Sequence, residues 1–204
     1  MCPLCSGEAR PYFRELFLQC TVCQGIIRSK THLPTPEEER ARYEEHHNDV
    51  NNPGYQAFVK PITDRVLQEQ DKLSLGLDFG SGTGPVISKL LTDRGYKINQ
   101  FDPFFDNNPD VLKLTYNYVA CCEVIEHFHA PDKEFRLLHS LLKPGGRLYC
   151  MTHLFSDDIT FDNWYYMRDP THTFIYQADT LTWIKDNVPF SELEIVGRLI
   201  VLTK

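Results

Sequence analysis

The sequence has no long apolar run and few basic residues, and each shortage argues against a class of function. No stretch approaches the roughly 20 consecutive apolar residues that span a bilayer, and the first residues do not read as a signal peptide. Lys and Arg number 21 against 28 Asp and Glu, so the net charge is −7 and the basic stripe of a nucleic-acid footprint is missing. We therefore expect a cytoplasmic protein without a membrane partner, and a nucleic acid is disfavoured as its substrate.

What the chain does contain describes one globular core with a small appendage. Hydrophobic residues make up 42% and charged residues 24% of the 204 positions, as in ordinary soluble domains. The motifs divide the chain into a cysteine-bearing start over residues 1–30, a helical bridge over 31–72 and an α/β domain over 73–204.

Four of the seven cysteines form two CxxC pairs separated by 14 residues, and these are Cys2, Cys5, Cys20 and Cys23. Two such pairs can close a tetrahedral site around one zinc ion, with no open position for catalysis. A segment this short cannot build a core of its own, so a metal would hold it together. We predict a structural zinc ribbon that could also dock a protein partner. A disulfide pair or free thiols are the alternatives, and the lack of an export signal disfavours disulfides.

The bridge reads as two helices. Thr35-Pro36-Glu37-Glu38 is typical of a helix start, which predicts a helix to about His47. After a turn at Asn51–Gly54, a second amphipathic helix is expected from Tyr55 to about Lys72. Polar and aromatic residues gather between the two, either as an exposed helix end or as a lid or substrate contact. The candidates are Tyr43, His46, Asn48 and Tyr55.

The most informative stretch is Leu75–Gly84, which reads as a buried strand, an acid at its tip and a glycine-rich turn opening a helix. Glycine has no Cβ and tolerates positive φ, so such a turn lets a ligand approach the backbone closely. A dinucleotide fingerprint would need its third glycine at Pro85 or Ile87, so a nicotinamide dehydrogenase is disfavoured. The next expected strand, Tyr96–Phe101, ends at Asp102, an acid placed to accept bonds from ribose hydroxyls.

Two later motifs narrow the interpretation. An expected buried strand from Tyr116 ends in the pentapeptide EVIEH at residues 123–127, and a helix over Asp132–Lys143 follows. The turn KPGG then leads into an expected strand over Arg147–Thr152. Together with the acid and GxGxG of the first loop, these motifs resemble the class I S-adenosylmethionine-dependent methyltransferases that act on small molecules. The resemblance covers about Leu75 to Lys204.

This resemblance implies a doubly wound, Rossmann-like sheet with a C-terminal antiparallel strand, ending in a hairpin around Gly197. It implies S-adenosylmethionine as cofactor. The residues it places at the cofactor are Asp78, Gly80, Ser81, Gly82, Gly84, Asp102, Pro103, Cys122, Glu123 and Val124. One departure stands out, because only about a dozen residues separate Asp102 from Tyr116. The third strand of the family is therefore expected to be missing or shortened, which leaves the adenine contacts to Pro103, Phe104 or Phe105.

The implied chemistry is an in-line displacement, in which an acceptor atom of a small molecule attacks the methyl carbon of a sulfonium. The protein then contributes positioning, exclusion of water and a base. The candidate bases are His127, His153, His172 and Glu123. For each histidine a hydrogen-bonded structural role is the alternative. The aromatic insertion Phe155–Tyr176 either covers the site or packs as a surface excursion.

Two other functions remain open at this point. Asp157, Asp158, Asp162 and Asn163 could bind a divalent ion in a metal-assisted O-methyltransferase, or form a solvated loop. The chain could also be a non-catalytic binding module, with its zinc ribbon carried on a methyltransferase-like fold. The identity of the acceptor is not written in the sequence.

Overall fold

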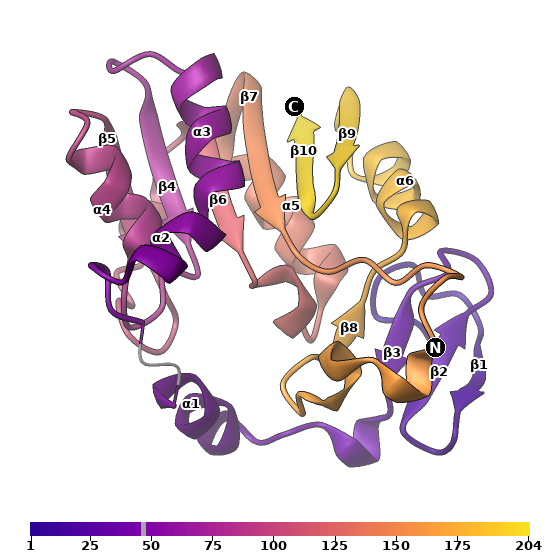
Figure 1. Cartoon of the computed structure of the whole chain (residues 1–204). Helices are drawn as coiled ribbons and strands as arrows, with labels where there is room; N and C mark the ends of the chain where they lie inside the picture. Colours follow the sequence, from indigo (N-terminus) through magenta and orange to yellow (C-terminus); the bar gives the residue numbers. More distant parts are fainter. Residues whose placement is uncertain (46–47) are drawn as a thin grey trace.

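A six-stranded sheet with helices on both faces lies beside a smaller four-stranded sheet (Figure 1). The structure is a computed structural model and describes residues 1–45 and 48–204. One apolar cluster joins the small sheet to the α5/α6 face of the large sheet, and a second fills the α2/α3/α4 face. No helix within the described ranges is long and apolar enough to cross a membrane.

The large sheet has the order β5-β4-β6-β7-β10-β9. Its parallel strands are β4 (Leu75–Phe79), β5 (Lys97–Phe101), β6 (Tyr116–Cys122) and β7 (Leu142–Met151). The strands β9 (Glu192–Val196) and β10 (Leu199–Thr203) form the closing hairpin around Gly197, and β10 pairs antiparallel with β7. This is the predicted doubly wound sheet with an antiparallel end.

The third strand of the common fold is absent from the described chain, as the short spacing predicted, and β5 is an edge strand. Only a short 3₁₀ turn, η2 (Val111–Lys113), lies between β5 and β6. A parallel crossover takes a dozen or more residues, so this connection has no length left for another strand.

The helices that flank the sheet mostly follow the sequence pattern. They are α1 (Pro36–Glu44), α2 (Pro53–Phe58), α3 (Lys60–Glu69), α4 (Val86–Thr92), α5 (Pro131–Leu141) and α6 (Ala178–Asn187). The single helix predicted from Tyr55 to about Lys72 is wrong, because the structure breaks it at Val59 into α2 and α3. The cause is Pro61, which has no N–H to donate and whose ring crowds the preceding turn. The predicted end of the first helix, His47, falls outside the described residues.

The small sheet combines the start of the chain with a distant segment. Its strands are β1 (Ala9–Phe13), β2 (Phe17–Cys20), β3 (Ile26–Arg28) and β8 (Phe174–Ile175), all antiparallel. The last of these comes from the aromatic insertion after β7. Two 3₁₀ turns of that insertion, η4 (Phe161–Asn163) and η5 (Tyr165–Arg168), pack their aromatic rings against Phe17 and Ile26 of the small sheet.

Candidate functional site

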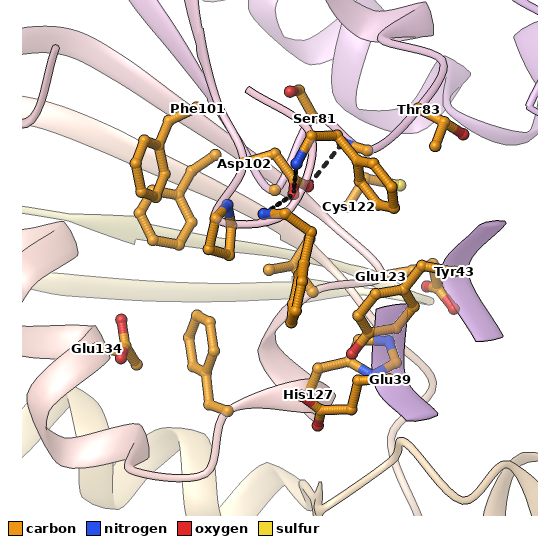
Figure 2. A pocket seen from close by; sticks show the side chains of 18 of the residues that line it. Glu39, Tyr43, Ser81, Thr83, Phe101, Asp102, Cys122, Glu123, His127 and Glu134 are labelled. Atoms are coloured by element: carbon orange, nitrogen blue, oxygen red, sulfur yellow. Dashed lines mark hydrogen bonds between the residues drawn. The ribbon is translucent and has the colours of Figure 1, made fainter. Parts of the chain in front are cut away.

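A cavity of about 620 Å³ opens at the carboxyl ends of β4, β5 and β6. This is where ligands bind in open α/β sheets. Its walls come from the glycine loop, the turn after β5, the tip of β6, α1 and α5, and from His172 of the insertion. Figure 2 shows the side chains converging on this space from both sides.

The glycine loop is held where a larger residue could not fit. Gly80 and Gly82 have φ of 79° and 63°, the left-handed region that favours glycine. A Cβ at Gly80 would lie 2.4 Å from the side chain of Val124, and one at Gly84 would lie 1.8 Å from the carbonyl oxygen of Asn48. The glycines therefore let the loop pack tightly against the tip of β6 and against the chain that follows α1.

Asp102 ties the glycine loop to the turn after β5. Its buried carboxylate accepts hydrogen bonds from the backbone N–H of Gly82 at 2.9 Å through Oδ2, and of Phe104 and Phe105 at 2.8 and 3.1 Å through Oδ1 (Figure 2). A carboxylate has about four acceptor positions, so it retains capacity for a ligand hydroxyl. Asp102 also lines the cavity, as its predicted ribose role requires.

Asp78, which the motif predicts to contact the cofactor, bonds to α4 in the structure. It is buried, and its Oδ2 accepts hydrogen bonds from the Ser88 N–H at 3.2 Å and Ser88 Oγ at 2.8 Å. Burial raises the pKa of Asp78 to about 6. Asp78 and Gly84 are not among the residues that line the cavity. The other predicted cofactor residues line it, namely Gly80, Ser81, Gly82, Asp102, Pro103, Cys122, Glu123 and Val124.

Beyond Asp102 the cavity becomes aromatic and carries one carboxylate. Phe79 and Phe101 pack with ring centroids 5.3 Å apart, and the aliphatic lining comes from Pro103, Leu112 and Leu137. Glu134 of α5 lines this end half-buried, and burial raises its pKa. Sequence reasoning missed Glu134. Its spacing of three from Leu137 places both on one helix face, which could have indicated it.

The opposite end holds two histidines, of which His172 is buried and His127 is half-buried. The Nδ1 of His127 lies 2.9 Å from the carbonyl oxygen of Thr171, and the Nδ1 of His172 lies 2.7 Å from that of Tyr166. A carbonyl oxygen only accepts, so each ring carries its proton on Nδ1 and leaves a lone pair on Nε2. Burial lowers the pKa of His127, and it lowers the pKa of His172 to about 3. The two rings lie 5.0 Å apart and are both neutral near pH 7.

The EVIEH motif also contributes two glutamates, of which Glu126 lies beside both histidines. Glu123 lines the cavity with a φ of 51° and pairs with Arg198 at 2.6 Å, while burial raises its pKa to about 8. Glu126 is fully buried and accepts hydrogen bonds from the hydroxyls of Tyr166 at 2.5 Å and Thr152 at 3.1 Å. Burial raises the pKa of Glu126 to about 7. Sequence reasoning missed Glu126 as a neighbour of both histidines, whose donor atoms lie within 4.8 Å of its carboxylate and of each other.

The structure does not bring His153 to this cavity. Its ring packs against Trp164 at 5.1 Å, and its Nδ1 lies 3.3 Å from the hydroxyl of Tyr165. The acids proposed for a divalent ion are also elsewhere. Asp158 is exposed and bonded to Ser156, and the exposed Asp162 pairs with Arg14.

Helix α1 lies across from the strand tips and lines the cavity with Glu39 and Tyr43 (Figure 1). The ring of Tyr43 contacts those of Phe104 and His127, at 5.5 and 5.2 Å. Glu39 bonds to His129 at 2.6 Å. Of the four lid candidates, Tyr43, Asn48 and Tyr55 line the cavity, and His46 lies outside the described residues.

The four cysteines of the CxxC pairs converge at the other end of the molecule. Sγ atoms lie 3.6 Å apart for Cys2 and Cys23 and 3.3 Å apart for Cys5 and Cys20, and all four lie within 4.8 Å of one another. A tetrahedral zinc site with Zn–S near 2.3 Å needs sulfurs about 3.8 Å apart, so this donor set fits zinc. Backbone N–H groups donate to three of the sulfurs, from Leu4, Gly7 and Val22.

Comparison with known proteins places this geometry in a family. A family model described as a methyltransferase domain matches residues 53–191. A curated relative, the ubiquinone biosynthesis O-methyltransferase of Vibrio atlanticus (strain LGP32), is 26% identical over 132 residues, which cover 60% of this chain and 55% of the relative. The chain thus spans about half the length of that relative.

Solved structures with the same fold include a 1,6-didemethyltoxoflavin-N1-methyltransferase of Burkholderia thailandensis with bound S-adenosylhomocysteine. It is 15% identical with a TM-score of 0.60, and the match covers 96% of this chain and 99% of that one. A SAM-dependent methyltransferase of Archaeoglobus fulgidus is 16% identical with a TM-score of 0.57, over 73% and 94% of the two chains. Since the family model spans more than half of the sequence, the chain belongs to the methyltransferase domain family and has the class I S-adenosylmethionine-dependent methyltransferase fold.

Proposed function

We propose that this protein transfers a methyl group from S-adenosylmethionine to a small-molecule acceptor. The observation that carries the proposal is the cavity itself, with the glycine loop and Asp102 at one end and two neutral histidines at the other. Its volume of about 620 Å³ suits a cofactor and a small acceptor together. An acceptor that fits inside this cavity does not require the basic surface on which a nucleic acid would dock.

In this proposal the cofactor lies along the glycine loop. Ser81, Gly82 and Thr83 face its amino-acid part, and Asp102 accepts hydrogen bonds from the ribose hydroxyls. The adenine base lies in the aromatic end between Pro103 and Leu137, where Glu134 accepts a hydrogen bond from its exocyclic amine. Glu134 thereby supplies the adenine contact, because the missing third strand provides no residue for it.

The cofactor supplies an electrophilic methyl group when it is bound, so the protein has to position the acceptor and accept its proton. An efficient base has a pKa near the working pH. Burial lowers the pKa of His172 to about 3, which makes it a poor proton acceptor. We therefore assign the proton acceptor to Nε2 of His127 and an orienting hydrogen bond to Nε2 of His172. A hydroxyl group donates its single proton to Nε2 of His127, and Nε2 of His172 then accepts from a second donor group of the same molecule. The curated relative is named as an O-methyltransferase.

The ribbon is assigned a structural Zn²⁺ held by its four cysteine thiolates, which fits the sulfur separations. The division into a ribbon (1–30), a bridge (31–72) and a methyltransferase domain (73–204) belongs to the same proposal. Docking of a protein partner on the ribbon stays a prediction from the sequence.

Calorimetry of the zinc-loaded protein with S-adenosylmethionine and S-adenosylhomocysteine tests the cofactor assignment, and we expect binding of both. Folded protein that binds neither would favour the non-catalytic alternative and refute the enzyme proposal. A screen of fractionated metabolites for S-adenosylhomocysteine release tests the acceptor. We expect hydroxyl-bearing fractions to raise the rate above background, and a screen without any active fraction would count against a small-molecule acceptor.

A further inference from the structure

The last strand of the ribbon is paired with the segment that follows His172. Ile26 and Ile27 of β3 pair with Ile175 and Phe174 of β8. Gly25 lies so close to this segment that a Cβ on it would be 2.2 Å from the ring of Phe174. The side chain of Gln177 donates to the carbonyl oxygen of Gln24 at 2.6 Å. The ribbon is therefore a pairing partner of the insertion.

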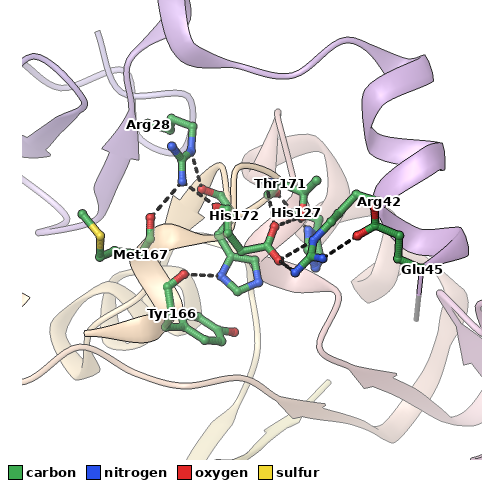
Figure 3. A network of polar contacts seen from close by, with 9 residues as sticks. Arg28, Arg42, Glu45, His127, Tyr166, Met167, Thr171 and His172 are labelled. Atoms are coloured by element: carbon green, nitrogen blue, oxygen red, sulfur yellow. Dashed lines mark hydrogen bonds and ion pairs between the residues drawn. The ribbon is translucent and has the colours of Figure 1, made fainter. Parts of the chain in front are cut away.

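Arg28 at the end of β3 reaches from the ribbon into this insertion. Its guanidinium is buried and donates to three backbone carbonyl oxygens, those of His172 at 3.0 Å, Met167 at 3.0 Å and Asp169 at 2.6 Å (Figure 3). A buried charge is costly unless its donors are satisfied, so these three carbonyls must stay around the guanidinium. The planar fork of arginine holds its donors in one rigid, spread arrangement, whereas the three donors of lysine share a single nitrogen on a flexible stem.

The segment folded around Arg28 carries the groups that orient both cavity histidines. Tyr166 supplies the carbonyl bonded to Nδ1 of His172, and Thr171 supplies the one bonded to Nδ1 of His127. A second contact from outside fixes the same segment, because Arg42 of α1 pairs with the carboxylate of Asp169 at 2.8 Å (Figure 3). Arg28, by contrast, binds the backbone carbonyls of this segment from the ribbon.

We propose that Arg28 is a positioning residue for the acceptor end of the cavity, and that the four-cysteine ribbon is a structural part of that end. The ribbon closes at Cys23, the strand β3 follows, and Arg28 then holds the 166–172 segment in the fold that orients His127 and His172. Metal loading of the cysteines thus controls the acceptor end while leaving the glycine loop and Asp102 in place. The inference rests on the proposed function of the histidines.

The test uses the full, zinc-loaded chain with the substitution Arg28→Met and the matched control Arg14→Met. Arg14 also links the ribbon to the insertion, but through an exposed ion pair with Asp162 that touches no cavity residue. Imidazole ¹⁵N signals report the tautomer and hydrogen bonds of His127 and His172. We expect them to shift in the Arg28 variant and to remain unchanged in the Arg14 variant.

Binding of S-adenosylhomocysteine is measured on the same samples. We expect less than about a twofold change in its affinity, because the contacts of Arg28 do not include the glycine loop and independent sites act additively. Arg28→Lys should restore only part of the wild-type imidazole spectrum. Unchanged imidazole signals in Arg28→Met, or equal shifts in Arg14→Met, would overturn the proposal.

Removing the metal from the wild-type protein tests the same proposal without a substitution that could disturb folding. A chelator that strips the wild-type protein, checked by metal analysis, should shift both imidazole signals while S-adenosylhomocysteine still binds. Loss of cofactor binding together with the imidazole shifts would overturn the restriction to the acceptor end. Failure of the proposed function would look different, since the zinc-loaded wild type would then not bind S-adenosylhomocysteine at all.

Discussion

The two ends of the cavity are built in different ways. The cofactor end comes from one continuous part of the chain, in which β4, the glycine loop, β5 and Asp102 follow each other. The acceptor end is assembled from α1, the turn after β6 and the 166–172 segment, which is held by Arg28 from the ribbon. A site made from local chain is fixed by local sequence, whereas a site made from distant segments can change with each of them. In the proposed function, cofactor binding therefore depends on local sequence, whereas the choice of acceptor depends on segments that lie far apart in the chain.

The largest effect should come from the cofactor end. Asp102→Ala removes the acceptor for the N–H groups of Gly82, Phe104 and Phe105, together with the proposed ribose contact. Bonds to a charged group contribute about 1.5–3 kcal/mol each, so we expect S-adenosylhomocysteine to bind at least about 100-fold more weakly in calorimetry. The imidazole signals of His127 and His172 should stay in place. A variant that binds within tenfold of wild type would contradict the ribose assignment.

A second prediction concerns the contact where the two ends meet. Gly84→Ala would place a Cβ 1.8 Å from the carbonyl oxygen of Asn48, so the chain after α1 must move. Overpacking of this kind costs about 1–3 kcal/mol, which we expect as a loss of stability in denaturant unfolding and as faster hydrogen exchange near Asn48.

Gly82→Ala is the matched control for that substitution. Gly82 has a φ of 63°, which side chains rarely adopt, whereas Gly84 has no such positive φ. A Cβ on Gly82 would nevertheless have room, because the nearest atom would be 3.8 Å away. It should lose about 1 kcal/mol or less and leave exchange near Asn48 unchanged, because only backbone conformation is strained. Equal behaviour of the two variants would show that the Asn48 contact does not link the ends.

This division also explains what could be predicted from the sequence. The glycine turn, the place of Asp102 and the missing third strand follow from local φ requirements, strand-tip position and connection length. The structure has positive φ at Gly80 and Gly82, Asp102 directly after β5 and, within the described residues, no strand between β5 and β6. The break of one predicted helix at Val59 was also a local matter, since Pro61 cannot continue it.

The acceptor end could not be predicted in the same way. A position just after a strand does not fix where a side chain points, so His153 was a candidate although it turns to Trp164. His127 and His172 were named, but their tautomers depend on carbonyls that only the folded insertion brings to them. The role of Arg28 requires β3 to pair with β8, and no local pattern encodes a partner so far along the chain.

The third prediction probes the acceptor end through pH. Burial lowers the pKa of His172 to about 3, whereas an unfolded histidine has a pKa near 6.5, so below about pH 6.5 only the unfolded chain binds this proton. Stability is therefore lost as the pH falls, by about 2 kcal/mol at pH 5 from this group alone. Glu126, with a pKa raised to about 7, acts in the opposite direction, so the whole-protein profile mixes both.

The substitution His172→Asn isolates the histidine, because the amide keeps a donor near the carbonyl of Tyr166 but cannot titrate. The difference in unfolding free energy between wild type and this variant should change by about 2 kcal/mol between pH 7 and pH 5 in denaturant titrations. His32→Asn, at an exposed position at the start of the bridge, should leave the profile as in wild type. A difference that does not vary with pH would mean that His172 is not buried in its neutral form.

The smallest expected effect concerns the cofactor end at the edge strand β5, where Glu134 of α5 lines the cavity and is proposed to contact the adenine. S-inosylhomocysteine carries a carbonyl where the adenine has its exocyclic amine, so a carboxylate at this place should repel it. One charge-assisted hydrogen bond corresponds to roughly tenfold tighter binding of S-adenosylhomocysteine by the wild type. The variant Glu134→Gln can donate to the carbonyl and should reduce or reverse that preference, measured by calorimetry with both ligands.

Glu39→Gln is the matched control, since Glu39 also faces the cavity but is bonded to His129 at the acceptor end, and it should keep the wild-type preference. If Glu134→Gln also keeps it, the adenine is recognised without α5, and the cofactor end is even more local than proposed.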